Sequence, residues 1–264
     1  MNRNLRVATL PLPIVWADKE ANFAAVENAL ALLPEDTDLV VLPELFSTGY
    51  TDDITLLTEL AERNTGITVD KIKEWSARTG AAFTGSFLAS TPPKIYNRGF
   101  FIEPSGEETF YDKRHLFSLS KEANLFAPGD SRPTIVRFRG WNIAMIVCYD
   151  LRFPVWCRCR GCEYDLLVIP ANWPQARAYA WEHLLIARAI ENQCCVVGAN
   201  RGGEDLYGNY DGMSYIFDGR GMAVGVQPVG SPFIVADLDA EKQQSYRRNF
   251  PIQNDADDFT LLTH

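Results

Sequence analysis

Three chemically reactive side chains stand directly after segments that are typical of buried strands. Glu44, Lys113 and Cys148 each follow a short run of strand-forming residues. A carboxylate, an amine and a thiol that meet in one crevice can hydrolyse a carbonyl compound. The carboxylate would take the thiol proton, and the amine would stabilise first the thiolate and then the developing oxyanion. The sulfur would attack the carbonyl carbon and form a thioester.

Each of these residues also has a structural interpretation. Cys148 ends the apolar run 142–147, and the polar segment behind it can open a helix. A cysteine at such a corner is exposed at the tip of a strand, near backbone N–H groups. The alternative is a buried core cysteine, the commonest fate of a free thiol. Glu44 alone is compatible with a helix cap and Lys113 with a solvated loop charge, so the combination favours catalysis.

The elements that must position these residues alternate between strand-like and helix-like patterns, which predicts an α/β fold. In such folds the ends of neighbouring strands surround one crevice. Strands are expected at 5–11, 38–42, 81–89, 95–103, 109–112, 134–138, 141–147, 164–170, 194–199, 212–217 and 222–234. Helices are expected at 19–33, 54–63, 69–79 and 175–192, and a polar, acidic tail from 249 onward.

Composition limits the classes of partner. The 264 residues are 47% hydrophobic and carry a net charge of −9, which disfavours binding to nucleic acid or to anionic membranes. No run approaches the roughly 20 apolar residues that span a bilayer, and the first residues lack a secretory signal. A cytoplasmic location is therefore expected, where the cysteines remain thiols. The cysteines are Cys148, Cys157, Cys159, Cys162, Cys194 and Cys195.

Three segments resemble the motifs of the nitrilase superfamily of carbon–nitrogen hydrolases. The segment 42–50 (LPELFSTGY) resembles its glutamate motif, 111–117 (YDKRHLF) its lysine motif and 146–154 (IVCYDLRFP) its cysteine motif. They occur in the family's order, and the resemblance covers 5–238. It implies a four-layer α-β-β-α sandwich and a mechanism without metal or organic cofactor.

The resemblance also implies a domain organisation and further site residues. One domain is expected over 1–264, with a core at about 1–240 and a C-terminal arm at 241–264 that is a candidate for the interface of a homodimer. Glu122, nine residues after Lys113, matches a second glutamate that orients the lysine or handles protons. A carboxylate beside Lys113 would keep the amine charged. The implied oxyanion hole consists of Lys113 and the backbone N–H of Tyr149.

The segment 170–181 (PANWPQARAYAW) is similar to the bacterial omega-amidase branch, whose members release ammonia from ω-amido 2-oxo acids such as 2-oxoglutaramate. Such a substrate needs an anchor for its carboxylate. Arg177 is a candidate, although a salt bridge at a helix start explains it equally well. Trp173 and Phe46 are expected as pocket walls. Two further pocket residues are expected near them, Phe117 and His115, while Trp173 and Phe117 are equally compatible with the core.

Other functions remain open from the sequence. Within the superfamily these are a nitrilase, an N-carbamoyl amidohydrolase or another amidase, and outside it a non-catalytic binding or thiol-sensing protein. Cys157, Cys159 and Cys162 lack a fourth ligand nearby, so an exposed cysteine-rich turn is preferred to a zinc site. His183 is interpreted as a structural helix residue. The basic patch 246–249 is either a solvated face or a dimer contact.

Overall fold

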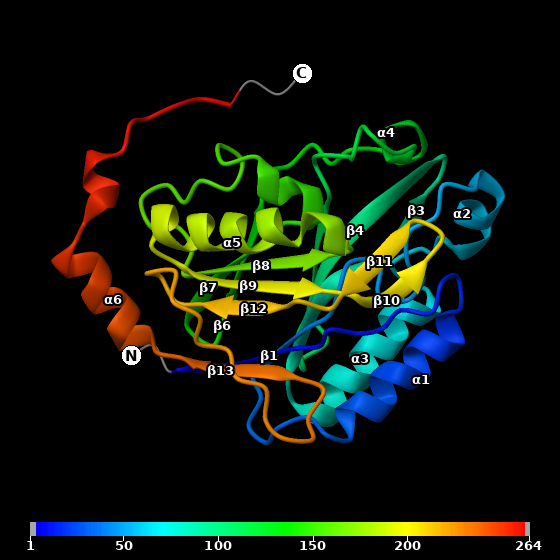
Figure 1. Cartoon of the computed structure of the whole chain (residues 1–264), viewed down its shortest axis with the longest axis horizontal. Coiled ribbons are helices and arrows are strands. Elements are labelled where there is room, and N and C mark those ends of the chain that lie inside the picture. The colour runs from blue at the N-terminus through cyan, green and yellow to red at the C-terminus, as the bar shows by residue number, and fades with distance from the viewer. Residues whose placement is uncertain (1–3, 262–264) are drawn as a thin grey trace.

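Two β-sheets stack face to face in the computed structural model, which describes residues 4–261 (Figure 1). The first sheet has the strand order β13-β1-β2-β3-β4-β5. Its strands are β1 (Leu5–Thr9), β2 (Leu39–Val41), β3 (Ala82–Thr91), β4 (Lys94–Ile102), β5 (Glu108–Asp112) and β13 (Ile234–Leu238). β1, β2 and β3 are parallel neighbours, and the other pairs in this sheet are antiparallel.

The second sheet has the order β12-β9-β8-β7-β6, in which β7, β8 and β9 are parallel neighbours. Its strands are β6 (Thr134–Phe138), β7 (Trp141–Met145), β8 (Leu166–Ala171), β9 (Cys195–Asn200) and β12 (Tyr215–Phe217). A separate hairpin consists of β10 (Gly202–Asp205) and β11 (Gly208–Asp211). Both sheets therefore contain the parallel strands that the sequence predicts.

Alternation along the strands divides the core in two. In β1, Val7 faces the second sheet, and its neighbour Ala8 faces the outer helices. These helices are α1 (Lys19–Leu30) and α3 (Ile67–Thr79), which bury Phe23 and Trp75 against the first sheet. On the far side, α5 (Ala178–Asn192) covers the second sheet. The layers are helix, sheet, sheet and helix, as predicted.

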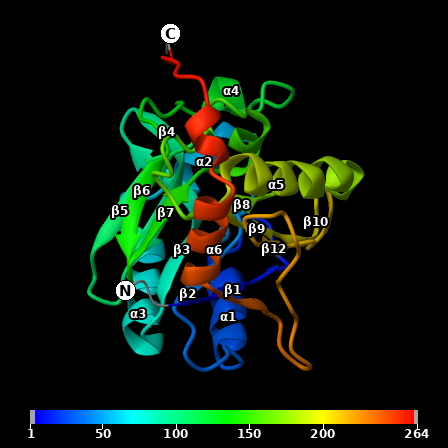
Figure 2. The ribbon, with the colours of Figure 1, turned by 90° about the vertical axis from the view of Figure 1, so that its left-hand side faces the viewer.

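The C-terminal segment holds a helix that the sequence analysis did not predict, α6 (Ala240–Asn249), which runs along the side of the molecule seen in Figure 2. Asp239 caps it by accepting from the N–H of Lys242. Arg247 bonds to Asp165 and to the backbone oxygens of Tyr164 and Gln193, at the start of β8 and β9. The prediction of a solvated face is therefore wrong for Arg247, whose guanidinium is bonded within the chain.

Three further differences concern loops. The expected strand at 222–234 is irregular apart from isolated bridges, and the β10–β11 hairpin was not predicted. Cys157 and Cys159 are buried, at 1% and 0% exposure, rather than exposed in a turn.

Among residues 4–261, no helix is long and apolar enough to cross a membrane. Over the same range, no cluster of three or more His, Cys, Asp or Glu side chains is arranged to hold a metal ion.

Candidate active site

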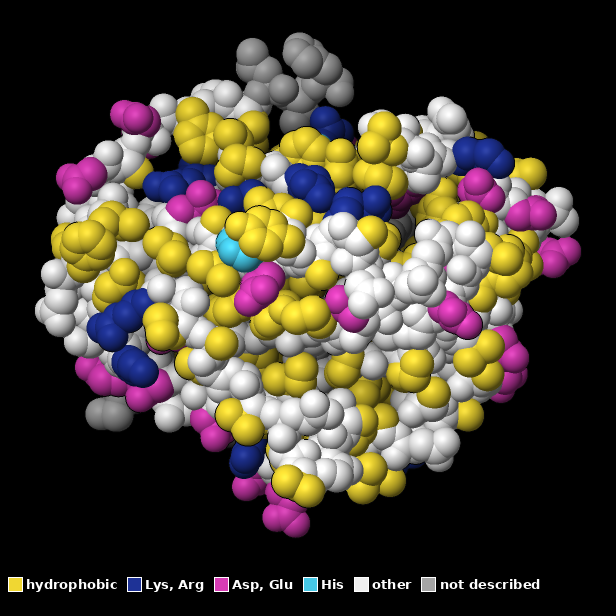
Figure 3. Space-filling model, in the orientation of Figure 1, with side chains coloured by type: hydrophobic (Ala, Val, Ile, Leu, Met, Phe, Trp, Pro, Cys, Tyr) yellow, Lys and Arg dark blue, Asp and Glu magenta, His cyan; other side chains and the backbone are white. Residues whose placement is uncertain are grey.

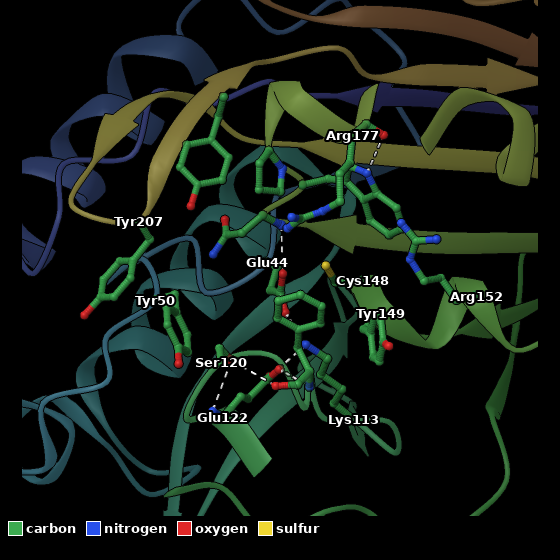
Figure 4. Close-up of a pocket in the computed structure, with 15 residues that line it drawn as sticks. Glu44, Tyr50, Lys113, Ser120, Glu122, Cys148, Tyr149, Arg152, Arg177 and Tyr207 are labelled. Atoms are coloured by element: carbon green, nitrogen blue, oxygen red, sulfur yellow. Dashed lines mark hydrogen bonds and ion pairs between the residues drawn. The ribbon is translucent and has the colours of Figure 1, made fainter. Parts of the chain in front are cut away.

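A pocket of about 260 Å³ opens where the carboxyl ends of strands from both sheets meet (Figure 4). Glu44 follows β2 and Lys113 follows β5 in the first sheet, whereas Cys148 follows β7 in the second. The short helix α4 (Glu122–Leu125) brings Glu122 to the same place. The structure thus brings together all four residues predicted as catalytic, although the first and the last, Glu44 and Cys148, are 104 positions apart in the sequence.

The Glu44 carboxylate is held by three hydrogen-bond donors. Its Oε1 accepts from Lys113 Nζ at 2.9 Å and from Asn97 Nδ2 at 2.7 Å, and its Oε2 accepts from the backbone N–H of Asn172 at 2.7 Å. Glu44 is 4% exposed, so few waters compete for these bonds. Sequence reasoning missed Asn97, which lies on β4 and carries no motif of its own.

Lys113 lies between two carboxylates. Its Nζ is 2.7 Å from Glu122 Oε1, and the second oxygen of Glu122 accepts from the N–H of Phe117 at 2.7 Å. Burial disfavours the charged amine, but the charges of Glu122 and Glu44 outweigh it and raise the pKa of Lys113 well above its usual value. The amine therefore stays an ammonium group.

A glycine fixes the loop that carries Lys113. The N–H of Gly129 donates to Lys113 O at 2.9 Å. A Cβ atom at Gly129 would collide with the backbone oxygen of Asp112. Only glycine lets the two chain segments approach this closely.

Cys148 begins a 3-10 turn (Cys148–Arg152) directly after the second sheet delivers it to the pocket. Its φ of +46° lies in the left-handed region, which costs a non-glycine residue roughly 1–2 kcal/mol. The side chain is 9% exposed and lines the pocket, so the prediction of a thiol exposed at a strand tip is wrong. The turn instead aims the sulfur inward.

The charge around Cys148 keeps it protonated at rest. Burial raises the pKa of the Cys148 thiol, Glu44 raises it further, and Lys113 opposes them only in part. Two carboxylates and one ammonium surround the sulfur, so a thiolate would add a second unbalanced negative charge. The resting group is therefore a thiol, which must lose its proton during attack.

Asp150 holds the nucleophile turn against the loop that carries Lys113. Its Oδ2 accepts from Tyr111 Oη at 2.8 Å and from the N–H of Val147 at 3.1 Å, and its Oδ1 contacts the backbone N–H and Nδ1 of His115, both at 2.8 Å. His115 also stacks on Phe153 with ring centroids 3.7 Å apart. The prediction that His115 lines the pocket is wrong, because these contacts turn its ring away from it.

Phe46 does not form a pocket wall either. It is fully buried in the core between the first sheet and its helices, with its ring centroid 6.1 Å from that of Trp75 and 5.9 Å from that of Phe100. The reason lies in the turn after Glu44, where Leu45 has a φ of +46°. This turn sends the next side chain back into the core.

The other predicted pocket residues do line it: Phe117, Tyr149, Trp173 and Arg177. The Arg177 guanidinium lies 5.3 Å from the centre of the Phe117 ring. Arg152, which the sequence analysis did not single out, lies 4.8 Å from the centre of the Trp173 ring.

Neither guanidinium has a carboxylate partner within residues 4–261, so the salt bridge considered for Arg177 is not formed there. On the face of the molecule drawn in Figure 3, Lys and Arg side chains gather along the region where α5 lies. Two cations that lie on aromatic rings in one pocket suit an anionic ligand.

Tyrosines from the unpredicted hairpin complete the mouth of the pocket. Tyr207 stands edge-on to Tyr50, with ring centroids 4.8 Å apart. Its hydroxyl donates to Asp52 Oδ1 at 2.9 Å, and Lys121 contacts the other oxygen of Asp52 at 3.2 Å. Asp52 therefore ties together the hairpin and the loop before α4.

Comparisons with known proteins agree with this geometry. A family model described as carbon–nitrogen hydrolase matches residues 6–248. Omega-amidase YafV of Yersinia enterocolitica is 42% identical over 263 residues, which are 98% of this chain and 99% of the relative. A 2-oxoglutaramate amidase of Bacillus subtilis is 31% identical over 254 residues, or 94% of this chain and 96% of the relative.

A solved structure is similar over the whole fold. A CN-hydrolase superfamily protein of Xanthomonas campestris, crystallised with an arsenic adduct in its active site, superposes with a TM-score of 0.92. It is 37% identical, and the match covers 98% of this chain and 99% of that one.

Proposed function

We propose, from the premise that this chain belongs to the carbon–nitrogen hydrolase family, that it is an omega-amidase. It would hydrolyse the terminal amide of an ω-amido 2-oxo acid such as 2-oxoglutaramate and release ammonia. The omega-amidase and 2-oxoglutaramate amidase relatives support this substrate class. The observation that carries the proposal is the buried network of Glu44, Lys113 and Glu122 beside Cys148, in one pocket with two guanidinium groups.

In the first half of the reaction the thiol attacks the amide carbon. Glu44 takes the proton from Cys148 as the S–C bond forms, because the resting thiol is not ionised. The carbonyl π electrons move onto oxygen, where the Lys113 ammonium and the N–H of Tyr149 stabilise the charge. Glu44 then gives the proton to nitrogen, the C–N bond breaks, and ammonia leaves a thioester.

In the second half, water replaces the departed ammonia. Glu44 takes a proton from that water as its oxygen attacks the thioester carbon. The C–S bond then breaks, the proton returns to sulfur, and a carboxylic acid product leaves. Glu122 supports both halves by holding Lys113 at 2.7 Å.

Arg177, assisted by Arg152, is the proposed anchor for the carboxylate at the other end of the substrate. Both line the pocket, and neither is neutralised by a described acidic side chain. The ring of Phe117 would keep the Arg177 guanidinium oriented, and the ring of Trp173 that of Arg152. A charged hydrogen bond to a carboxylate contributes roughly 1.5–3 kcal/mol, which is enough to select substrates that carry one.

The test is ammonia release from 2-oxoglutaramate by the wild type and by Cys148→Ala. The control is Cys162→Ala, which removes a partly exposed thiol outside the pocket. Release by the wild type and the control but not by Cys148→Ala is expected. Turnover by Cys148→Ala would refute the mechanism, and an inactive wild type would refute the substrate and lead to assays of nitriles and N-carbamoyl compounds.

A cytoplasmic homodimer is the companion proposal. A reducing compartment would keep Cys148 as the thiol that the mechanism uses. The C-terminal segment 241–264 is the proposed contact region, and its exposed Phe250 is compatible with that role. Light scattering during size-exclusion chromatography tests the mass, with a monomer at all concentrations as the opposing result.

A further inference from the structure

The side-chain amide of Asn172 has no protein partner in the pocket. Its Nδ2 and Oδ1 atoms are both buried, and neither makes a hydrogen bond within the described part of the chain. Asn172 lines the pocket directly after β8. A buried amide without partners is costly and uncommon, which points to a ligand as its partner.

The neighbouring asparagines are fully engaged by the protein. Asn97 donates to Glu44 and accepts from Ser86 Oγ at 2.8 Å. Asn200 accepts from the N–H of Trp173 at 2.7 Å and donates to its backbone oxygen at 2.9 Å. Asn172 thus differs from other buried amides of the site, since only its backbone is used.

The backbone of Asn172 fixes where its side chain can act. Its N–H donates to Glu44 Oε2 at 2.7 Å, so the residue adjoins the carboxylate that protonates the leaving nitrogen. An ω-amido 2-oxo acid offers oxygen acceptors along its length, but its carboxamide nitrogen is its only hydrogen-bond donor. The carboxamide N–H is therefore the one group of this substrate that can donate a hydrogen bond to Asn172 Oδ1.

We propose that Asn172 Oδ1 accepts an N–H of the scissile carboxamide and so selects amides over esters, an inference that rests on the proposed function. Asn172 Nδ2 donates to an oxygen of the same substrate. The contact holds the leaving nitrogen toward Glu44, which delivers its proton. An ester of the same acid has an alkoxy oxygen in place of the N–H and leaves Oδ1 unpaired.

The experiment compares 2-oxoglutaramate with the methyl ester at the same position of the same 2-oxo acid. The kcat/KM values are measured for the wild type, Asn172→Ala and the control Gln175→Ala, an exposed residue of the same segment. Loss of a paired buried polar group typically costs roughly 10- to 100-fold. We expect Asn172→Ala to lose that factor with the amide. With the ester, the lost Nδ2 bond is offset by removal of the unpaired Oδ1 atom, so kcat/KM should stay within about threefold of the wild type.

The outcomes separate this inference from the function on which it rests. An equal loss with amide and ester, or no loss with either, in Asn172→Ala refutes the proposed contact while the function stands. A wild type that turns over neither compound refutes the proposed function and, with it, this contact. Asn172→Leu, which fills the space without polar atoms, must give the same amide-to-ester ratio as Asn172→Ala.

Discussion

Glu122→Gln is the sharpest perturbation of the site, because both oxygens of Glu122 accept hydrogen bonds. One accepts from Lys113 Nζ and the other from the N–H of Phe117, each at 2.7 Å. Glutamine has the same shape but one oxygen and one NH2 group. In either orientation, its NH2 group faces a donor that the carboxylate had satisfied.

The magnitude follows from burial. Glu122 is 3% exposed, so solvent does not compensate for the change. Removing one partner of a buried pair costs about 3–5 kcal/mol, but Lys113 keeps Glu44 as a partner, so we expect about 2–4 kcal/mol. A loss of that size in the free energy of unfolding lowers Tm by roughly 5–15 °C. The same free energy lost from the stabilisation of the transition state lowers kcat/KM by roughly 30- to 1,000-fold.

Scanning calorimetry and ammonia release measure the two effects, with the exposed Glu59→Gln on α2 (Ile54–Leu60) as the matched control. A Glu122→Gln protein with the Tm and kcat/KM of the wild type would refute the idea that this carboxylate holds Lys113. A loss shared by Glu59→Gln would show a general charge effect instead.

Three other changes have defined outcomes. The free energy of unfolding should fall as the pH rises above 9.0, the usual pKa of a thiol, because the unfolded chain releases the Cys148 proton that the folded chain keeps. Chemical denaturation between about pH 8 and pH 11 measures this fall, which should be shallower for Cys148→Ala. Gly129→Ala should push the backbone off Asp112 and displace Lys113, lowering kcat by roughly tenfold or more in steady-state assays, whereas unchanged kcat would contradict this close approach. Phe46→Ala should cost about 3–5 kcal/mol in urea denaturation as a core truncation.

The meeting of Glu44, Lys113 and Cys148 in one pocket could be predicted from the sequence because each residue follows its strand directly. Glu44, Lys113 and Cys148 stand within three residues of β2, β5 and β7, and strand ends gather at one edge of a sheet. The two-sheet sandwich was also predicted, and the structural neighbour agrees with it. The sequence pattern does not predict how the two sheets are placed relative to each other.

Residues that act through long-range contacts were missed for that reason. Asn97 reaches Glu44 across the sheet from β4, and Arg152 is defined by its place over Trp173. Asn97 carries no local signal, and although Arg152 lies within the cysteine motif 146–154, the motif does not show which ring its side chain meets. Their roles depend on tertiary packing alone.

The errors at Phe46 and His115 have a different origin. Both lie within a few residues of Glu44 or Lys113, but nearness in sequence does not place a side chain near the pocket. The left-handed turn at Leu45 sends Phe46 into the core, and Asp150 draws His115 to the back of the nucleophile turn. Backbone reversals of this kind are set by φ values that a one-dimensional pattern does not encode.

The pocket takes its reacting groups from two sheets, with the proton acceptor on one and the sulfur on the other. Turnover is therefore a direct reporter of sheet docking. During refolding, either sheet can acquire its hydrogen-bond ladder without restoring a single turnover. Ammonia release should return only in the final packing step, later than the circular dichroism signal of the strands.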